Sequence, residues 1–281
     1  FLYLVIYFTY IALTTTPEQI NESDSLNYHI PIAQSIGRGE IFNPDDLENG
    51  TGYYPAVGES ILALFMLFRI PLNLFNVLSL VLLFISTFYL ARVYLLEPGA
   101  AFIYSFAITS LTSVLRLPNA QTIDIWVAVF FTLSLYFLNK LKQKPITYLF
   151  FGIPLGLLTG TKYSGIFLAT ILVLVYSKKL IKNINFKKLS LFLVPFSVFG
   201  LFWYIRNYLL RGNPFYPGRF LMFPYNPAFN IQGWMPIKTI FFLDGGLFLY
   251  LESLISEFLV WSLLYLTAPF LIIYMYRNKL F

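Results

Sequence analysis

Residues 72–95 read LNLFNVLSLVLLFISTFYLARVYL, and Arg92 is the only charged residue among them. As a helix this stretch would reach about 36 Å, enough to cross a hydrocarbon core about 30 Å thick. The whole chain is 58% hydrophobic and only 11% charged, whereas a soluble domain carries about 25% charged residues. These features predict a helical protein that resides in a membrane.

Further apolar runs are long enough, or nearly so, to cross a bilayer as helices. They are Ala100–Leu115, Ile125–Asn139, Ile146–Leu158, Gly165–Tyr176, Leu189–Leu210 and Leu254–Tyr276. The opening run Phe1–Leu13 is shorter and is interpreted as a first span that has been clipped. We therefore expect an all-α, polytopic transmembrane bundle with about eight spans. It would form a single domain over residues 1–281 and be truncated at both ends.

The short run Glu59–Phe68 decides the orientation of every later helix. If it lies in the membrane interface, one side collects eleven basic residues and one acid, and the other side eight basic residues and twelve acids. Lys and Arg accumulate in cytoplasmic loops, so the charge distribution favours this interfacial helix. The loops 16–58 and 211–253 are then extracytoplasmic. We expect a multi-pass protein of a bacterial or archaeal plasma membrane, with its active site on the outer face.

The segment Ile146–Tyr176 is interpreted as two short helices. As one helix it would be about 46 Å long, and it would place the two lysine clusters of the chain on opposite sides of the membrane. A break at Gly160–Gly165 keeps both clusters on the cytoplasmic side. Lys162 is then expected at or just below the outer surface.

Five charged residues reach the same extracytoplasmic face in this topology: Asp24, Asp124, Lys162, Arg206 and Arg211. Charged groups within a membrane protein are costly and usually functional. Cations hold phosphate, Arg as a bidentate fork and Lys as a point charge. A carboxylate can take a proton from an acceptor hydroxyl. The combination suits a reaction on an anionic lipid headgroup.

Each of these residues also has a simpler interpretation. Asp24 and Asp124 could each be an N-cap of the helix that follows, and the three cations could be snorkelling interface anchors. His29 is the only histidine, so a polar contact is expected there rather than a histidine metal pair. The chain has no cysteine, which excludes disulfides and thiolate metal sites. The net charge of +6 reports orientation in a membrane protein, and no nucleic-acid partner is expected.

Several loose motifs follow one another along the chain. They are Asp24–Pro31 with Gly39, Tyr53-Tyr54-Pro55 leading to Glu59, Thr122-Ile123-Asp124, Gly156 through Tyr163, and Arg206-Asn207 followed by Gly212–Pro217. In this order, and relative to the predicted spans, they resemble the GT-C glycosyltransferases that use lipid-phosphate sugar donors. That superfamily includes dolichyl-phosphate-mannose–protein mannosyltransferases and bacterial aminoarabinose transferases. The resemblance extends from the start of the chain to about Pro217.

The resemblance implies roles for individual residues. Asp24 aligns with the first-loop acid, the catalytic base, and Asp124 with the acid of the second external loop. The residues expected to bind substrate are Tyr28, His29, Tyr54, Glu59, Lys162, Tyr163, Arg206 and Arg211. The chain departs from many relatives because serines flank Asp24 on both sides. It also lacks an Asp-x-Asp pair in the second external loop, so a divalent metal is allowed but not predicted.

The expected activity is transfer of a sugar from a polyprenyl-phosphate donor to a glycan, lipid or protein acceptor, by a single inverting displacement. A transporter or flippase for lipid-linked sugars is an alternative, but such proteins place charged groups near the bilayer midplane. The predicted spans are nearly free of charge at their centres. A glycan ligase or polymerase and an inactive assembly module remain open as further interpretations.

Overall fold

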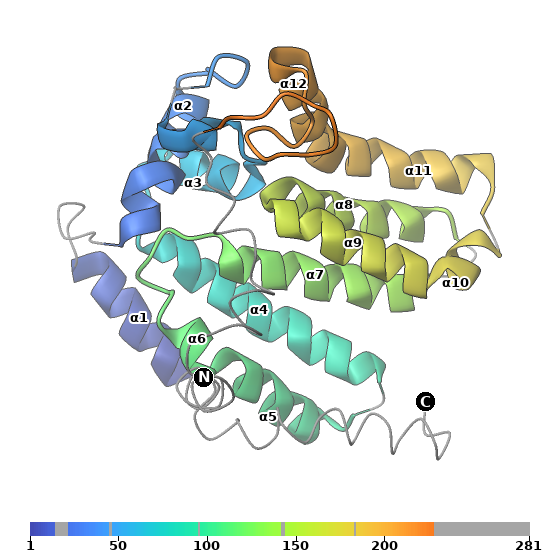
Figure 1. Ribbon diagram of the computed structural model, residues 1–281. Coiled ribbons are helices and arrows are strands. Elements are labelled where there is room, and N and C mark those ends of the chain that lie inside the picture. The colour runs from blue at the N-terminus through green and yellow to red at the C-terminus, as the bar shows by residue number, and fades with distance from the viewer. Residues whose placement is uncertain (15–21, 45–46, 95, 142–143, 183, 228–281) are drawn as a thin grey trace, which may run out of the picture.

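The computed structural model describes residues 1–14, 22–44, 47–94, 96–141, 144–182 and 184–227 (Figure 1). All regular secondary structure within these ranges is helical, which confirms the predicted all-α class for this part of the chain. The α-helices are α1 (Leu2–Thr14), α2 (Ile30–Gly37), α3 (Val57–Leu67), α4 (Leu74–Val93), α5 (Pro98–Thr109), α6 (Thr112–Leu115), α7 (Asp124–Asn139), α8 (Ile146–Thr161), α9 (Tyr163–Val175), α10 (Ser177–Ile181), α11 (Phe186–Phe196) and α12 (Phe202–Arg211).

The predicted apolar runs correspond to helices wherever the structure describes them. Among the residues that the structure describes, two helices are long and apolar enough to cross a membrane. They are Leu74–Val93 and Phe186–Arg211, and in the second a π-helical turn at Ser197–Leu201 joins α11 to α12. The other apolar helices have between 10 and 17 residues. The run Leu254–Tyr276 lies outside the described residues, so the predicted number of spans stays a prediction.

One predicted run differs from the structure in its continuity. We expected a single helix over Ala100–Leu115, but α5 ends at Thr109 and the short α6 begins at Thr112. Leu111 between them has φ −59° and ψ 138°, outside the helical region. Hydrophobicity alone does not register such a break, because both flanking segments are equally apolar.

The helices form a bundle in which neighbours along the chain lie side by side (Figure 1). Helix α4 packs against α1, α5 and α7, and α8 packs against α7, α9 and α11. The buried core between them is mainly aromatic and aliphatic and includes Phe75, Leu83, Val129, Phe151 and Leu158. Helices α2 and α3 pack against one another, and α3 also contacts α8. The first loop is thereby fixed to the end of the bundle where α8 ends.

A row of glycines lets α8 and α11 approach closely. A Cβ atom at Gly152 would lie 2.5 Å from the carbonyl oxygen of Phe192, and one at Gly156 would lie 2.9 Å from the Cα of Phe196. Gly160 continues the row at the same four-residue spacing and is closer still to the carbonyl oxygen of Phe199. Small residues at this spacing are a recurrent means of packing helices in membranes, where close van der Waals contact drives association.

The predicted break between the two helices of Ile146–Tyr176 is confirmed. Helix α8 ends at Thr161, Lys162 is extended with φ −156° and ψ 153°, and α9 begins at Tyr163. The helices then lie side by side as a hairpin (Figure 1). Gly165 lies directly against the backbone of Leu158, so the tight return is possible because Gly165 has no side chain. Lys162 stands at the tip of this hairpin.

The outer surface of the bundle is rich in large apolar side chains. Tyr3 on α1, Ile103 on α5, Leu174 on α9 and Val194 on α11 are 75%, 65%, 66% and 63% exposed. Exposed apolar patches on this scale mark contact with a membrane or with another protein. Together with the two long apolar helices they support association with a membrane.

Candidate functional site

The helical turn that carries Asp24 is capped by Glu22. The Glu22 carboxylate accepts hydrogen bonds from the backbone N–H of Asp24 (3.0 Å), the backbone N–H of Ser25 (2.6 Å) and the Ser25 hydroxyl. Partial burial would raise the pKa of Glu22, but these hydrogen bonds outweigh it and hold the pKa below its ordinary value. The interpretation of Asp24 as a cap is therefore wrong, because its side chain makes no capping hydrogen bond.

The Asp24 carboxylate is instead exposed, and among the described residues Tyr28 holds it. The Tyr28 hydroxyl, one turn later, donates a hydrogen bond of 3.0 Å to Oδ2 of Asp24. Burial, followed by the charge of Asp24, raises the pKa of Tyr28 far above its ordinary value. Tyr28 consequently remains a protonated donor. The hydrogen bond fixes the direction of the carboxylate, and no described residue forms a hydrogen bond with its second oxygen, Oδ1.

A hydrogen bond joins the Asp24 turn to the segment that leads into Asp124. The Ser25 hydroxyl accepts a hydrogen bond of 2.8 Å from the backbone N–H of Gln121. Gln121 in turn donates to the side chain of Asn73 at 2.7 Å, next to the start of α4. Asn76 holds the same segment by donating to three of its backbone carbonyls. The first loop and the residues before α7 therefore form one connected layer.

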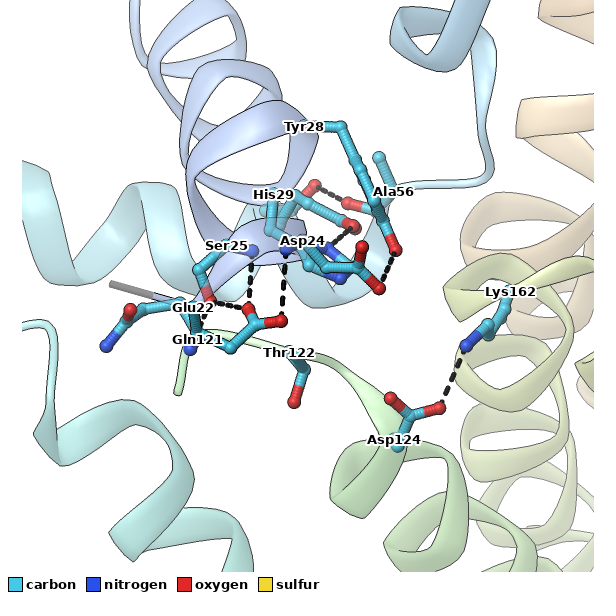
Figure 2. Close-up of polar contacts among 12 residues, drawn as sticks. Glu22, Asp24, Ser25, Tyr28, His29, Ala56, Gln121, Thr122, Asp124 and Lys162 are labelled. Atoms are coloured by element: carbon cyan, nitrogen blue, oxygen red, sulfur yellow. Dashed lines mark hydrogen bonds and ion pairs between the residues drawn. The ribbon is translucent and has the colours of Figure 1, made fainter. Parts of the chain in front are cut away.

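Asp124 and Lys162 form an ion pair across two helix ends. Asp124 is the first residue of α7, and its Oδ1 lies 2.8 Å from Nζ of Lys162 at the tip of the α8–α9 hairpin. Their side chains are 50% and 42% exposed, so the pair itself adds little to stability. The cap of α7 is Ile123, which makes the interpretation of Asp124 as a cap wrong. Figure 2 shows this ion pair together with Asp24 on the turn of the first loop.

His29 and Glu59 lie behind this surface and are fully buried. His29 Nδ1 lies 2.7 Å from Oε1 of Glu59 on α3. The other oxygen of Glu59 has no partner among the described residues. The polar contact expected for His29 is confirmed. No group of three or more Asp, Glu or His side chains suited to a metal ion occurs in the described ranges.

Aromatic rings connect Asp24 with the buried cation Arg206. Tyr28 packs edge-on against Tyr54, and Tyr54 against Tyr163, with 5.8 Å between ring centroids in each case. Burial and then the charge of Asp24 raise the pKa of Tyr54 to about 12. The backbone carbonyl of Tyr54 accepts a hydrogen bond of 3.4 Å from Arg206. The tyrosines thus form a continuous wall beside the carboxylate.

Arg206 occupies an interior position that the sequence did not predict. It is only 2% exposed, and its guanidinium stacks 4.9 Å from the ring of Trp203. Its Nε and Nη2 both donate to Oδ1 of Asn207, at 3.1 and 2.8 Å. We expected Arg206 to be a cation of the outer surface, and this is wrong because its side chain is buried. Its position near the end of a span is as predicted. Buried guanidinium groups need such partners.

Asn207 is the residue that sequence reasoning missed at this point. Its Nδ2 donates to the Tyr53 carbonyl at 2.7 Å and to the Tyr163 hydroxyl at 3.1 Å. Tyr163, expected to contact substrate, is itself buried and donates to the Tyr216 carbonyl. Asn207 thereby ties α12 to the first loop and to α9. The Arg206-Asn207 dipeptide is one of the sequence motifs, but the sequence around a single Asn does not indicate which distant residues it hydrogen-bonds.

Arg211 is the exposed cation at the end of α12. Its guanidinium lies 4.6 Å from the ring of Tyr53 and 5.5 Å from the ring of Tyr216. Stacking on aromatic faces orients a guanidinium while leaving its N–H groups available. Gly212 follows with φ 67° and ends the helix in the left-handed conformation that glycine adopts readily. Arg211 is thus exposed at the end of α12, and its role in binding substrate stays a prediction.

Comparison of the chain with models of known protein families, with curated proteins and with solved structures finds no match.

Proposed function

We propose that this protein is an integral-membrane glycosyltransferase of GT-C type. It would transfer a sugar from a polyprenyl-phosphate donor to an acceptor hydroxyl on the extracytoplasmic side. The observation that carries the proposal is the state of Asp24, an exposed carboxylate that caps no helix and is oriented by Tyr28. A structural carboxylate at a helix start would bond the backbone, as Glu22 does here. A base needs an accessible oxygen in a fixed direction.

In the proposed reaction Asp24 takes the proton of the acceptor hydroxyl as that oxygen attacks the anomeric carbon. The bond between the anomeric carbon and the phosphate oxygen breaks, and polyprenyl phosphate leaves with the electron pair. A phosphate leaving group needs no general acid, so one essential carboxylate is sufficient. This corresponds to the base half of an inverting glycoside hydrolysis. Tyr28 and Tyr54 would border the sugar.

The leaving phosphate requires cations that can respond to its growing charge. Lys162 is the best-placed residue, because it is half exposed at the hairpin tip and its ion pair with Asp124 holds it in position. Arg211 is a second, exposed cation. We assign Arg206 a positioning role instead, because it is buried and hydrogen-bonded to Asn207 and Tyr54. His29 and Glu59 likewise support the turn that carries Asp24.

The proposal includes a polytopic arrangement of about eight spans, with α3 in the outer interface and the lysine-rich connections in the cytoplasm. The exposed apolar side chains of α1, α5, α9 and α11 support it. The shorter helices reach about 18–24 Å, so their flanking residues would have to complete each crossing. The donor would enter from the bilayer. The acceptor would be a glycan, lipid or protein, and no metal is assigned a role.

The test uses the full chain in lipid nanodiscs with a panel of radiolabelled undecaprenyl-phosphate sugars carrying mannose, glucose or aminoarabinose. A cell-envelope extract supplies acceptors, and the transferred label is counted. Asp24→Asn is expected to lower transfer by about 10²- to 10⁴-fold while donor binding is retained. Glu97→Gln is the matched control, because Glu97 is an exposed carboxylate outside the site. Wild-type transfer by Asp24→Asn would remove the base from the mechanism. Translocation of the lipid-linked sugar in sealed proteoliposomes, without sugar transfer, would favour a transporter.

A further inference from the structure

An apolar groove lies between α9 and α11, away from the candidate site. Its floor is α8, which packs against both helices, and its volume is about 370 Å³. The walls include Ile166, Ala169 and Val173 from α9 and Leu189, Phe192 and Phe196 from α11. This volume falls in the usual range for sites that bind small molecules. The lining is almost entirely hydrocarbon, so only an apolar ligand segment would gain by entering.

The segment at one end of this groove, residues 178–188, is rich in lysine. Leu180 of α10 and Ile184 of the following linker line the groove, and five lysines occur among and around them, at positions 178, 179, 182, 187 and 188. No Asp or Glu occurs anywhere between residues 125 and 243. The positive charge at this end is therefore not balanced by nearby acids of the same hairpin or of α11.

The lysines differ in their surroundings in a way that suits an anionic headgroup. Lys178, Lys182 and Lys187 are exposed. Lys188 is buried, and its Nζ lies 5.6 Å from the ring centroid of Tyr148, which itself lines the groove. Positive charge thus extends from the surface to the rim of the apolar groove. A single lipid would therefore place its anionic headgroup on the lysines and its acyl chain in the apolar groove.

We propose that this groove binds one acyl chain of an anionic phospholipid, whose phosphate lies on the lysines of residues 178–188. Basic pockets between membrane helices on the cytoplasmic side are established sites for anionic lipid headgroups. The phosphate of this lipid would lie near the end of α9 opposite Lys162, about 20 Å away for a helix of 13 residues. The bound lipid is therefore distinct from the polyprenyl donor proposed for the other end of the bundle. Its binding would not require sugar transfer.

The test measures lipid retention by the full chain purified in detergent and then exchanged into a mixture of phosphatidylglycerol and phosphatidylcholine. Native mass spectrometry is expected to detect one retained phosphatidylglycerol per chain. Lys178→Gln with Lys182→Gln should lower its affinity by roughly 30-fold, from about fivefold per lysine near an anionic headgroup. The same double change at two exposed cations of other segments, Arg69→Gln with Arg219→Gln, should leave retention unchanged.

A second pair of variants tests the groove itself. Val173→Trp places an indole into the groove and should abolish retention, because Val173 lines it. Val175→Trp on the same helix is the control, because Val175 is 71% exposed and does not line the groove. Equal retention of both phospholipids, an equal effect of the lysine and the arginine double changes, or unchanged retention in Val173→Trp would each overturn the proposal. Sugar transfer, measured separately, has no bearing on these outcomes.

Discussion

Replacing Asn207 by Ala is expected to destabilise the fold strongly. Asn207 is completely buried. It bridges a charged group and a backbone carbonyl, because its amide accepts from Arg206 and donates to Tyr53. After truncation both partners stay buried without this hydrogen bond. An unsatisfied buried polar group costs far more than the net gain of the bond it has lost.

The magnitude follows from the two partners. A carbonyl left unpaired costs about 1–3 kcal/mol, and a hydrogen bond to a charged group contributes about 1.5–3 kcal/mol. Adding the lower halves of the two ranges gives a loss of about 2.5–4 kcal/mol for Asn207→Ala. The control Asn27→Ala removes only an exposed hydrogen bond of 3.0 Å to Ser23, and should cost less than about 0.5 kcal/mol.

The assay is reversible unfolding of the full chain in mixed micelles, followed by tryptophan fluorescence. A double-mutant cycle with Arg206→Leu adds a second test, since partners in one network are non-additive. We expect a coupling free energy of about 2 kcal/mol between Arg206 and Asn207, within the range for residues in contact. A loss for Asn207→Ala no larger than that for Asn27→Ala, or strict additivity in the cycle, would refute the reasoning.

Three further outcomes are expected. Gly156→Leu should separate α8 from α11 and lower the yield of folded protein, measured by size-exclusion chromatography. Gly99→Leu is the control and should leave the yield unchanged, because an added Cβ at Gly99 meets nothing within 4 Å. Tyr28→Phe should lower sugar transfer about 10-fold with donor affinity unchanged, because the ring stays and only the bond to Asp24 is lost; normal transfer by this variant would contradict the orienting role. The pKa of Glu22 is lowered in the folded protein, so Glu22 stabilises the fold at pH values above its ordinary pKa of 4.5, and this stability is lost as the pH falls through the lower folded pKa. The acid-unfolding curve of Glu22→Gln should lack this decline in stability, and an unaltered curve would argue against it.

The sequence alone predicted the features that depend on local composition. Apolar runs located the helices, because burying or embedding a backbone requires its own hydrogen bonds to be made within the segment. The break at Lys162 was also predictable, since the length limit and the distribution of lysines pointed to the same place. Tyr28 could be expected near Asp24 because residues four apart lie on one face of a helix.

The tertiary structure decided everything that depends on partners distant in the chain. Asn207 contacts residues 154 and 44 positions away, and no local pattern reveals such partners. The sequence predicts that Arg206 is a cation at the membrane interface, but packing buries it. A hydrogen bond to Asn207 and a cation–π contact with Trp203 stabilise its charge there. The sequence also left open whether Glu22 or Asp24 is the cap, although the contacts of Glu22 are local, because both acids are close enough to the helix start to bond it. Only the folded geometry determines which carboxylate reaches the free N–H groups, and so which one is left for chemistry.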